Sequence, residues 1–459
     1  MDMYLRMRRA VIATVCACSA VAGVGMAAGP GSALALPVVN CAAITGSGSS
    51  LQAEQQTLWT SLVGTVGFLL KINKLTEECS PGNPAISYTA TSSGKGLAEF
   101  GAGTSVLEPK EAGNAALKLD AYIGTDDPPT KAQLGEMKVA AGTAAWTTAV
   151  VAAPIAMIVH LPSGCEVTTT EVPIPNKVLN EAWLGKFANW KTFLTAIETA
   201  NGLKFKEATA KVSCEGSPVL LEVRSDNSGT SYAFKQYLCQ FEIASWQVPA
   251  KGCEQDGEFI NDSKKWPAAV SETHKAGILN EKGKGEVEAV EEEPGSLGYA
   301  NLADAVKGKF TSFLKKPVGA SIFWAQVENA TAAREPEGAT AGTGNCTATY
   351  TFPTGVEAEA KKGEWEKVHY GNPAATTGYQ ICTFTYDVGW ENYLVTNLEK
   401  DYGGTLKAAE ETGNTAQGYF EYMVRSTEGQ AATAIAPDYN ALPANVDKVA
   451  VEDAEKLKG

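Results

Sequence analysis

The sequence predicts an α/β fold, because apolar strand-like runs alternate with amphipathic helical stretches along the chain. The chain has 459 residues, of which 44% are hydrophobic and 20% charged, so it is long enough for two or three globular domains with a large core. A net charge of −14 argues against nucleic acid or an anionic membrane surface as the main partner. Only three scattered histidines are present, so neither a histidine-based metal site nor a histidine-driven hydrolase is expected.

Residues 1–35 match a secretory signal peptide. Arginines precede an Ala/Val-rich apolar run that ends in the small-x-small pattern of residues 33–35 (Ala-Leu-Ala). The alternatives are a transmembrane anchor, which the small residues disfavour, and lipidation at residues 15–18 (Val-Cys-Ala-Cys), which too little apolar sequence precedes. We therefore expect an exported protein, periplasmic, extracellular or on the cell surface. Its net charge after cleavage is −16, because the signal carries three Arg and one Asp.

Eight cysteines remain after cleavage, and an even number in an exported chain favours disulfide bonds. None has Cys-x-x-Cys spacing, which disfavours zinc binding and thioredoxin-like chemistry. Pairing in sequence order is the simplest hypothesis, although the sequence leaves other connectivities open. The eight are Cys41, Cys79, Cys165, Cys214, Cys239, Cys253, Cys346 and Cys382.

The first elements follow from the spacing of apolar residues. Leucine and valine recur at helical spacing between residues 58 and 69, in a helix that begins near Leu51. Residues 86–90 and 219–223 predict strands. Residues 150–161 form the most apolar stretch after the signal, but the run is too short and too mixed to span a membrane, so we expect a buried strand.

The later part of the chain contains one further helix and several insertions. Residues 286–293 are acidic, yet two valines lie three apart and a Pro-Gly pair ends the run, which predicts a short helix with one buried edge. Residues 101–118, 250–275 and 330–378 are rich in Gly, Ala, Thr, Glu and Lys with weak periodicity. They predict surface insertions.

Three small-residue turns each precede a predicted helix: residues 45–51 (Thr-Gly-Ser-Gly-Ser-Ser-Leu), 91–96 (Thr-Ser-Ser-Gly-Lys-Gly) and 224–230 (Arg-Ser-Asp-Asn-Ser-Gly-Thr). A helix N-terminus presents unpaired N–H groups and partial positive charge, so it attracts anions. Arg224 adds a fork of donors suited to a tetrahedral oxyanion. Taken singly, each turn also fits a plain helix cap. Together they predict an oxyanion held by neutral dipoles and one arginine.

Two of these turns imitate catalytic motifs. Ser92 precedes Lys95 by three residues, as in penicillin-binding enzymes, and Ser228 follows Asp226 as in some serine proteases. The companion motifs of both enzyme classes are missing, and no histidine lies where a catalytic partner of these serines would be expected. The glycine spacing fits neither a dinucleotide fingerprint nor a Walker loop. We therefore expect no catalytic residues and no cofactor, with a phosphoesterase or serine hydrolase as the less favoured alternative.

A fourth segment, residues 122–128 (Tyr-Ile-Gly-Thr-Asp-Asp-Pro), bears on ligand choice. A carboxylate that faces a bound oxyanion is repulsive unless it accepts a proton from the ligand. Monohydrogen phosphate carries such a proton at neutral pH and sulfate does not, so the carboxylate would discriminate between them. The alternative is that Asp126 and Asp127 only form a turn before Pro128.

These four segments, in this order, resemble the phosphate-binding protein of the high-affinity phosphate ABC transporter, a type II substrate-binding protein family. Residues 180–190 resemble the family's Leu-Gly-Lys-Ile-x-x-Trp signature, and residues 294–299 and 439–443 match later landmarks. The resemblance runs from about residue 44 to the C-terminus and is interrupted by the three insertions.

The resemblance implies a two-domain, clam-shell periplasmic-binding-protein fold of type II, with discontinuous domains joined by a hinge. Domain 1 would comprise residues 36–152 and 380–459, and domain 2 residues 153–379. The protein would capture inorganic phosphate, deliver it to an ABC transporter permease in the membrane, and act as a monomer. Alternatives are another oxyanion in the same fold (sulfate, molybdate or an organic phosphate) and an envelope or adhesive role for the insertions.

The resemblance also implies nine phosphate-binding residues. Domain 1 would supply two hydroxyl donors, one backbone N–H and the proton-accepting carboxylate, in the order Ser50, Ser93, Leu51 and Asp126. Domain 2 would supply the guanidinium, the carboxylate that orients it and the donors of a helix turn, namely Arg224, Asp226, Ser228, Gly229 and Thr230.

Four positions depart from the family pattern. Leu51 replaces an aromatic residue, and Asn227 replaces a glycine. Lys95 stands where a small residue is common and either strengthens anion binding or faces solvent. Asp127 beside Asp126 leaves open which carboxylate faces the ligand.

Overall fold

The computed structural model describes residues 38–458 apart from several gaps. The longest gaps are 80–84, 109–118, 168–172, 202–213 and 247–280, within which Trp266 alone is described. The predicted signal peptide and nearly all of the predicted insertion at 250–275 lie outside the described residues.

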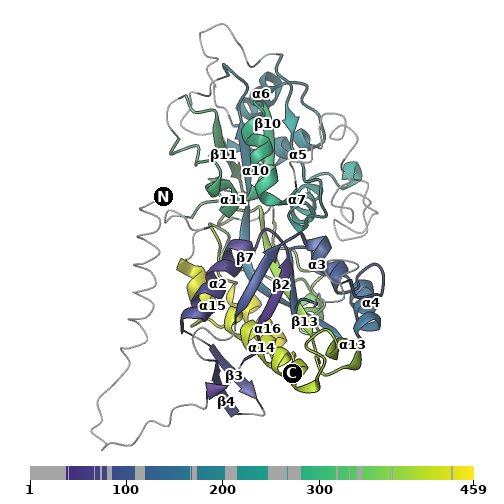
Figure 1. Ribbon diagram of the computed structural model, residues 1–459. Coiled ribbons are helices and arrows are strands. Elements are labelled where there is room, and N and C mark those ends of the chain that lie inside the picture. The colour runs from purple at the N-terminus through teal and green to yellow at the C-terminus, as the bar shows by residue number, and fades with distance from the viewer. Residues whose placement is uncertain are drawn as a thin grey trace, which may run out of the picture. The chain divides into compact units, whose positions relative to one another are not determined.

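The main sheet begins with three parallel strands (Figure 1), in which β2 (Ile44–Gly48) lies between β5 (Ile86–Ala90) and β6 (Tyr122–Thr125). β6 pairs antiparallel with β13 (Cys382–Trp390), and β13 pairs antiparallel with β7 (Ala145–His160). Because parallel neighbours end at the same edge of a sheet, the turns that follow β2, β5 and β6 lie together.

The long strand β7 belongs to two halves of the sheet. Its residues up to Pro154 pair with β13, and from Ile155 onward it pairs with β10 (Ser296–Asn301) and β11 (Ile322–Glu328). Proline has no N–H to donate, and Pro154 lies where β7 changes partners. Three short strands complete the second half: β8 (Pro173–Ile174) and β12 (Ala333–Arg334) beside β11, and β9 (Leu220–Leu221) beside β10.

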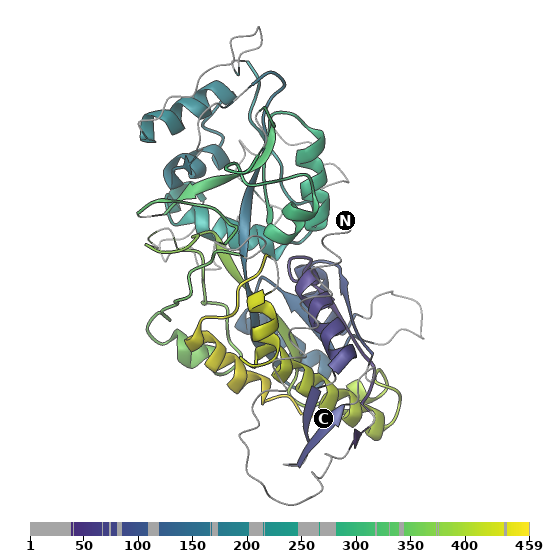
Figure 2. The same cartoon turned by 90° about the vertical axis from the view of Figure 1, so that its left-hand side faces the viewer.

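Helices accompany both halves of the sheet. Those near β2, β6, β13 and the first half of β7 are α2 (Ala53–Val66), α3 (Ser93–Glu99), α4 (Lys131–Ala141), α13 (Thr396–Glu399), α14 (Leu406–Val424), α15 (Gly429–Ile435) and α16 (Ala444–Ala454). Those near β8 to β11 are α5 (Asn176–Trp183), α6 (Trp190–Asn201), α7 (Gly229–Cys239), the 3₁₀ turn Ile243–Trp246, α10 (Lys282–Glu292) and α11 (Leu302–Lys307). Figure 2 shows α2, in purple, beside the C-terminal helices, in yellow. A small sheet of β1 (Val38–Val39), β4 (Leu75–Cys79) and β3 (Phe68–Ile72) lies apart from the main sheet.

The predicted α/β class is confirmed, and so are several elements. The strand predicted at 86–90 is β5. The buried strand predicted at 150–161 is the second part of β7, which begins earlier, at Ala145, ends at His160 and is buried from Thr147 to Val159. The helix predicted between residues 51 and 69 ends earlier than expected, at Val66. Gly67 follows in the sequence and favours termination, so Leu69 lies in β3 instead.

Two other elements differ in extent. The strand predicted at 219–223 is limited to Leu220–Leu221, because the chain then turns to form the loop that begins at Arg224. The helix predicted at 286–293 begins four residues earlier, at Lys282. Two glycines in its first turn, which disfavour a helix, hid this start in the sequence. Close packing requires one of them to be glycine, because a β-carbon on Gly283 would lie 1.8 Å from Oδ2 of Asp304.

The predicted surface insertion at 330–378 contributes to the core, so that expectation is wrong for part of it. Trp365 is fully buried, and its indole N–H donates to the carbonyl of Thr147 at 3.1 Å and to Asp453 at 2.9 Å. Tyr370 stacks on Phe384 of β13 with ring centroids 4.2 Å apart. A helix within the insertion, α12, covers only Val356–Ala360, which explains the weak periodicity. In the predicted insertion at 101–118, by contrast, residues 103–106 are mainly exposed.

Two disulfides follow the predicted sequence order. Cys165 pairs with Cys214, and Cys346 pairs with Cys382. Cys41 and Cys239 are disulfide-bonded as well. The Cys346–Cys382 bond ties the insertion to the first residue of β13. Within the described chain, no helix combines the length and apolar character needed to cross a bilayer.

Candidate anion-binding site

The ends of β2, β5 and β6 bring three turns together around Asp126, which is 2% exposed. The Ser49 hydroxyl donates to Oδ1 of Asp126, and the Ser49 N–H donates to the carbonyl of Gly124 at 2.7 Å. The N–H of Asp126 donates to the Ser93 hydroxyl oxygen at 3.2 Å. One serine after β2 and one at the start of α3 therefore lie against the residue that follows β6.

The N-terminus of α7 approaches the same carboxylate from the other half of the sheet. The Thr230 hydroxyl donates to Oδ2 of Asp126 at 3.4 Å. A β-carbon on Gly229 would lie 2.6 Å from the Ser93 hydroxyl oxygen and 2.8 Å from the β-carbon of Asp126. Only glycine allows so close an approach. Asp126 is thus contacted from elements more than a hundred residues apart in the sequence.

Arg224 and Asp226 form a buried ion pair beside this point. The guanidinium donates from Nε to one carboxylate oxygen at 2.7 Å and from Nη2 to the other at 2.6 Å. Asp226 also accepts the N–H of Lys282 at 3.3 Å, and the Ser50 hydroxyl accepts the N–H of Gly283 at 3.2 Å. The start of α10 therefore links Ser50 to the Arg224–Asp226 pair.

The electrostatics favour a proton held near neutral pH. Burial raises the pKa of Asp126 to about 6, although hydrogen bonds from Ser49, Thr385 and Thr230 and the positive charge of Arg224 lower it. Burial, and next the charge of Asp126, raise the pKa of Asp127 to about 7. Burial alone would lower the pKa of Arg224, but its hydrogen bonds to Asp226 and the charge of that carboxylate raise it. With its pKa raised toward neutral pH, the Asp126 carboxylate accepts a proton more readily than an ordinary aspartate does.

Comparison with known proteins identifies the family. The family model of the PBP superfamily domain matches residues 43–391, well over half of the chain. The chain belongs to the PBP superfamily.

The relatives of this PBP-superfamily chain include two phosphate-binding proteins. The phosphate-binding protein PstS 3 of Mycobacterium leprae is 26% identical over 284 residues, which cover 60% of each protein. The phosphate-binding protein PstS of Methanocaldococcus jannaschii is 23% identical over 436 residues, covering 93% of this chain and 94% of the relative. Among solved structures, the periplasmic phosphate-binding protein PfluDING, bound with phosphate, aligns with a TM-score of 0.55 at 17% identity over 88% of this chain and 92% of its own. That likeness supports the predicted type II periplasmic-binding-protein fold.

The PBP-superfamily chain brings most of the predicted site residues together. Ser93, Asp126, Gly229 and Thr230 meet directly, while Ser50, Arg224 and Asp226 lie around the start of α10. The structure uses the remaining two groups internally: the Leu51 N–H donates to the Ser49 hydroxyl at 3.1 Å, and the Ser228 hydroxyl accepts the N–H of Ser231 at 3.2 Å, which caps α7.

The structure also shows the surroundings of three positions that depart from the family pattern, Lys95, Asn227 and Asp127. Lys95 is exposed, and its N–H donates to the Ser92 hydroxyl that caps α3. The carbonyl of Asn227 accepts the N–H of Gly94 at 3.1 Å. Asp127 is half-buried, and its N–H donates to the Thr125 hydroxyl at 3.0 Å. Its neighbour Asp126 is fully buried, and its carboxylate accepts the hydrogen bonds from Ser49 and Thr230.

The hydrolase alternative gains no support from this geometry. The Ser92 and Ser228 hydroxyls both act as helix caps. The ring of His160 contacts the carbonyl of Val290, and the ring of His369 contacts Gln236. In the described ranges, no group of three or more His, Cys, Asp or Glu side chains could hold a metal ion.

Sequence reasoning missed three groups at the site. Ser49, which was not among the predicted site residues, donates to Asp126. The Tyr299 hydroxyl lies 2.5 Å from the Ser231 hydroxyl and accepts the Arg224 N–H at 3.3 Å. Glu286 is fully buried, and burial together with a neighbouring acidic charge raises its pKa well above the ordinary value. The Ser-Leu-Gly-Tyr motif that ends at Tyr299 was a usable signal, whereas nothing local distinguishes Ser49 from Ser50.

Proposed function

We propose that this protein binds inorganic phosphate around Asp126 and Arg224 and, after export, delivers it to an ABC transporter permease. The observation that carries the proposal is the convergence on Asp126: three strand ends from one half of the sheet and the N-terminus of α7 from the other meet at this one residue, and Ser49 and Thr230 donate to its carboxylate. The phosphate-binding relatives from Mycobacterium leprae and Methanocaldococcus jannaschii give it independent support.

The chemistry of the groups suits monohydrogen phosphate. Serine and threonine hydroxyls, the N–H groups at the start of α7 and the Arg224 guanidinium can all donate to phosphate oxygens. Asp126 can accept the proton that monohydrogen phosphate carries, and sulfate offers none. Because donors surround the ligand, the net negative charge of the chain does not oppose binding.

We further propose the division into domain 1 (36–152 and 380–459) and domain 2 (153–379). The change of partners along β7 at Pro154 supports the first boundary, and the start of β13 at Cys382 supports the second. One refinement follows from the contacts: the 344–372 segment packs mainly on domain 1, through Trp365 and Tyr370. Phosphate contacted from both domains would stabilise a closed form.

The test is isothermal titration of the ligand-stripped mature protein with phosphate and then with sulfate at pH 7.5. We expect one-to-one binding of phosphate and no sulfate signal. Folded protein that binds sulfate, molybdate or an organic phosphate instead would overturn the ligand assignment and leave the fold intact. Turnover of a generic phosphoester would contradict the proposal that the protein is not an enzyme.

The role of Asp126 is tested by Asp126→Asn in the same titration. An amide can donate to an oxyanion, so the variant should gain sulfate binding relative to phosphate. Asp127→Asn is the matched control and should keep the selectivity of the wild type. If Asp126→Asn and wild type discriminate equally, proton acceptance by Asp126 is wrong.

A further inference from the structure

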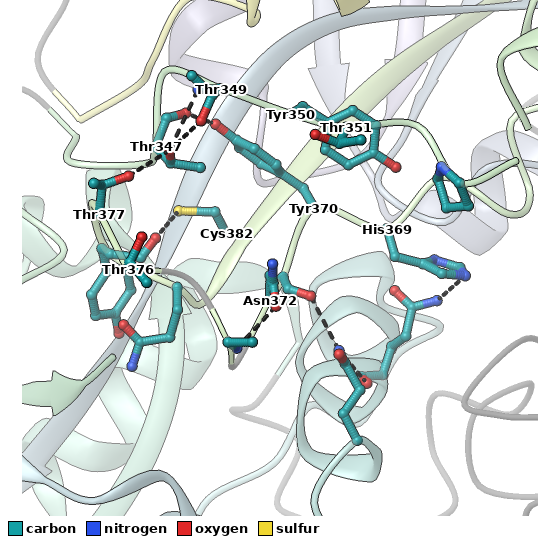
Figure 3. Close-up of a pocket in the computed structure, with 17 residues that line it drawn as sticks. Thr347, Thr349, Tyr350, Thr351, His369, Tyr370, Asn372, Thr376, Thr377 and Cys382 are labelled. Carbon is teal, nitrogen blue, oxygen red and sulfur yellow. Dashed lines mark hydrogen bonds between the residues drawn. The ribbon is translucent and has the colours of Figure 1, made fainter. Parts of the chain in front are cut away.

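A cavity lies away from the anion site, between the C-terminal end of α7 and the insertion (Figure 3). Its volume is about 540 Å³. Gln236 of α7 and Gln240, which directly follows that helix, contribute one wall, and residues 347–377 contribute most of the rest. Pockets that bury small ligands typically have ~300–1,000 Å³, so this cavity is large enough for a small organic molecule.

The described residues that line the cavity carry no permanently charged side chain. Among the 17 described residues that form its wall there is no Asp, Glu, Lys or Arg. The one titratable imidazole, His369, stays neutral at pH 7 because burial lowers its pKa to about 4. A charged ligand would lose its hydration without gaining a counter-charge, which is unfavourable. The wall therefore selects an uncharged ligand and disfavours a second phosphate.

The wall is nevertheless rich in hydrogen-bonding groups. Figure 3 shows the hydroxyls of Thr347, Thr349 and Thr377 gathered on one side, with Thr347 at 3.2 Å from each of the other two. The lining residues Asn372, Thr376 and Thr377 are exposed, so their polar side chains can meet a ligand in the cavity. A purely apolar ligand would leave such groups dry and unpaired, at a cost. The complementary ligand has several hydroxyls of its own.

Aromatic rings complete the wall. Tyr350 and Tyr370 lie edge to face, with centroids 6.0 Å apart, on the same side of the cavity as β13. The Cys346–Cys382 disulfide and the stacking of Tyr370 on Phe384 hold this part of the insertion against β13. The wall is thus largely pre-formed, which lowers the entropic cost of binding.

We propose that this cavity binds a neutral mono- or disaccharide. Uncharged hydroxyl and amide groups beside aromatic rings match the alternating hydroxyl and apolar faces of a sugar. The assignment does not depend on phosphate binding, because the anion site lies at the opposite end of α7, around Gly229 and Thr230.

The experiment is titration of the disulfide-intact mature protein with D-glucose, maltose and trehalose, each followed by ligand-observed NMR. D-glucuronate is the matched probe, since it differs from glucose by one carboxylate. We expect at least one neutral sugar to bind at least tenfold more tightly than glucuronate. Saturating phosphate should not displace it. If none of the three sugars binds, if glucuronate binds equally well, or if phosphate competes, the proposal is wrong.

Variants locate the binding to this cavity. Thr349→Val removes one exposed hydroxyl and should weaken sugar binding about two- to tenfold, the range for a single neutral hydrogen bond. Thr349→Trp places an indole at the cavity wall and should abolish binding. Thr199→Val, on the exposed face of α6, is the matched control and should have no effect. Circular dichroism verifies folding independently of either ligand. Unchanged sugar affinity in Thr349→Trp would overturn the location.

Discussion

The Arg224–Asp226 pair allows stability and ligand binding to be separated by mutation. The two side chains are 3% and 5% exposed and share two hydrogen bonds of 2.7 and 2.6 Å. In Arg224→Met, Asp226 would stay buried with only the Lys282 N–H as a donor, at 3.3 Å. Breaking a buried pair in this way typically costs about 3–5 kcal/mol of unfolding free energy.

The same variant should bind phosphate more weakly. Hydrogen bonds from a charged group contribute about 1.5–3 kcal/mol, which corresponds to a loss of about ten- to 150-fold in affinity. The double variant Arg224→Met/Asp226→Asn removes the unpaired charge, so it should recover at least half of the lost stability. It cannot recover the affinity, since the guanidinium is still missing.

Urea unfolding and isothermal titration with phosphate measure the two effects. Arg425→Met is the matched control, because Arg425 pairs with Glu421 within α14 and away from the site, so phosphate affinity should not change. A double variant no more stable than Arg224→Met would refute the argument from uncompensated charge. Wild-type phosphate affinity in Arg224→Met would refute contact between the guanidinium and the ligand.

Two further predictions concern packing and pH. In Gly229→Ala the new β-carbon would lie 2.6 Å from the Ser93 hydroxyl oxygen and force α7 away, so phosphate affinity should fall at least about fivefold in titration, as expected for about 1 kcal/mol of overpacking. Gly135→Ala, with no heavy atom within 4 Å, is the control and should leave affinity unchanged. Burial raises the pKa of Asp453 from 3.8 to about 8, although two indole hydrogen bonds lower it. Because the folded pKa is the higher one, the stability contributed by this group is complete below pH 4 and lost as pH rises through 8. Unfolding free energies should therefore vary less between pH 4 and 8 in Asp453→Asn than in the wild type or in the neighbouring Glu452→Gln, and equal slopes would contradict the assignment.

Much of the site was predictable because its parts are local. Strand, small-residue turn and helix start follow one another in each of the three segments, and hydrophobic periodicity with Ser and Gly signals detects such units. The resemblance to the phosphate-binding family implied that Asp226 orients Arg224, and the two side chains do pair. The parallel order of β2, β5 and β6 then gathers their turns at one edge.

Other features depend on packing between distant segments. The hydrogen bond from Ser49 to Asp126 depends on how the turn after β2 packs against the end of β6. The insertion at 330–378 has little periodicity, so the burial of Trp365 and Tyr370 against β7 and β13 could not be anticipated.

By itself, the sequence determined the α/β class and the turns that present donors at helix starts, because each arises from residues close together in the chain, and its resemblance to a known family implied the Arg224–Asp226 pair. Only the tertiary structure decided that Thr230 reaches Asp126, that Gly229 lies against Ser93, and that α7 and the insertion enclose a cavity whose described lining residues carry no permanent charge. Contacts between residues so far apart in the sequence depend on how whole helices and strands pack together. Local hydrophobic periodicity carries no information about that packing.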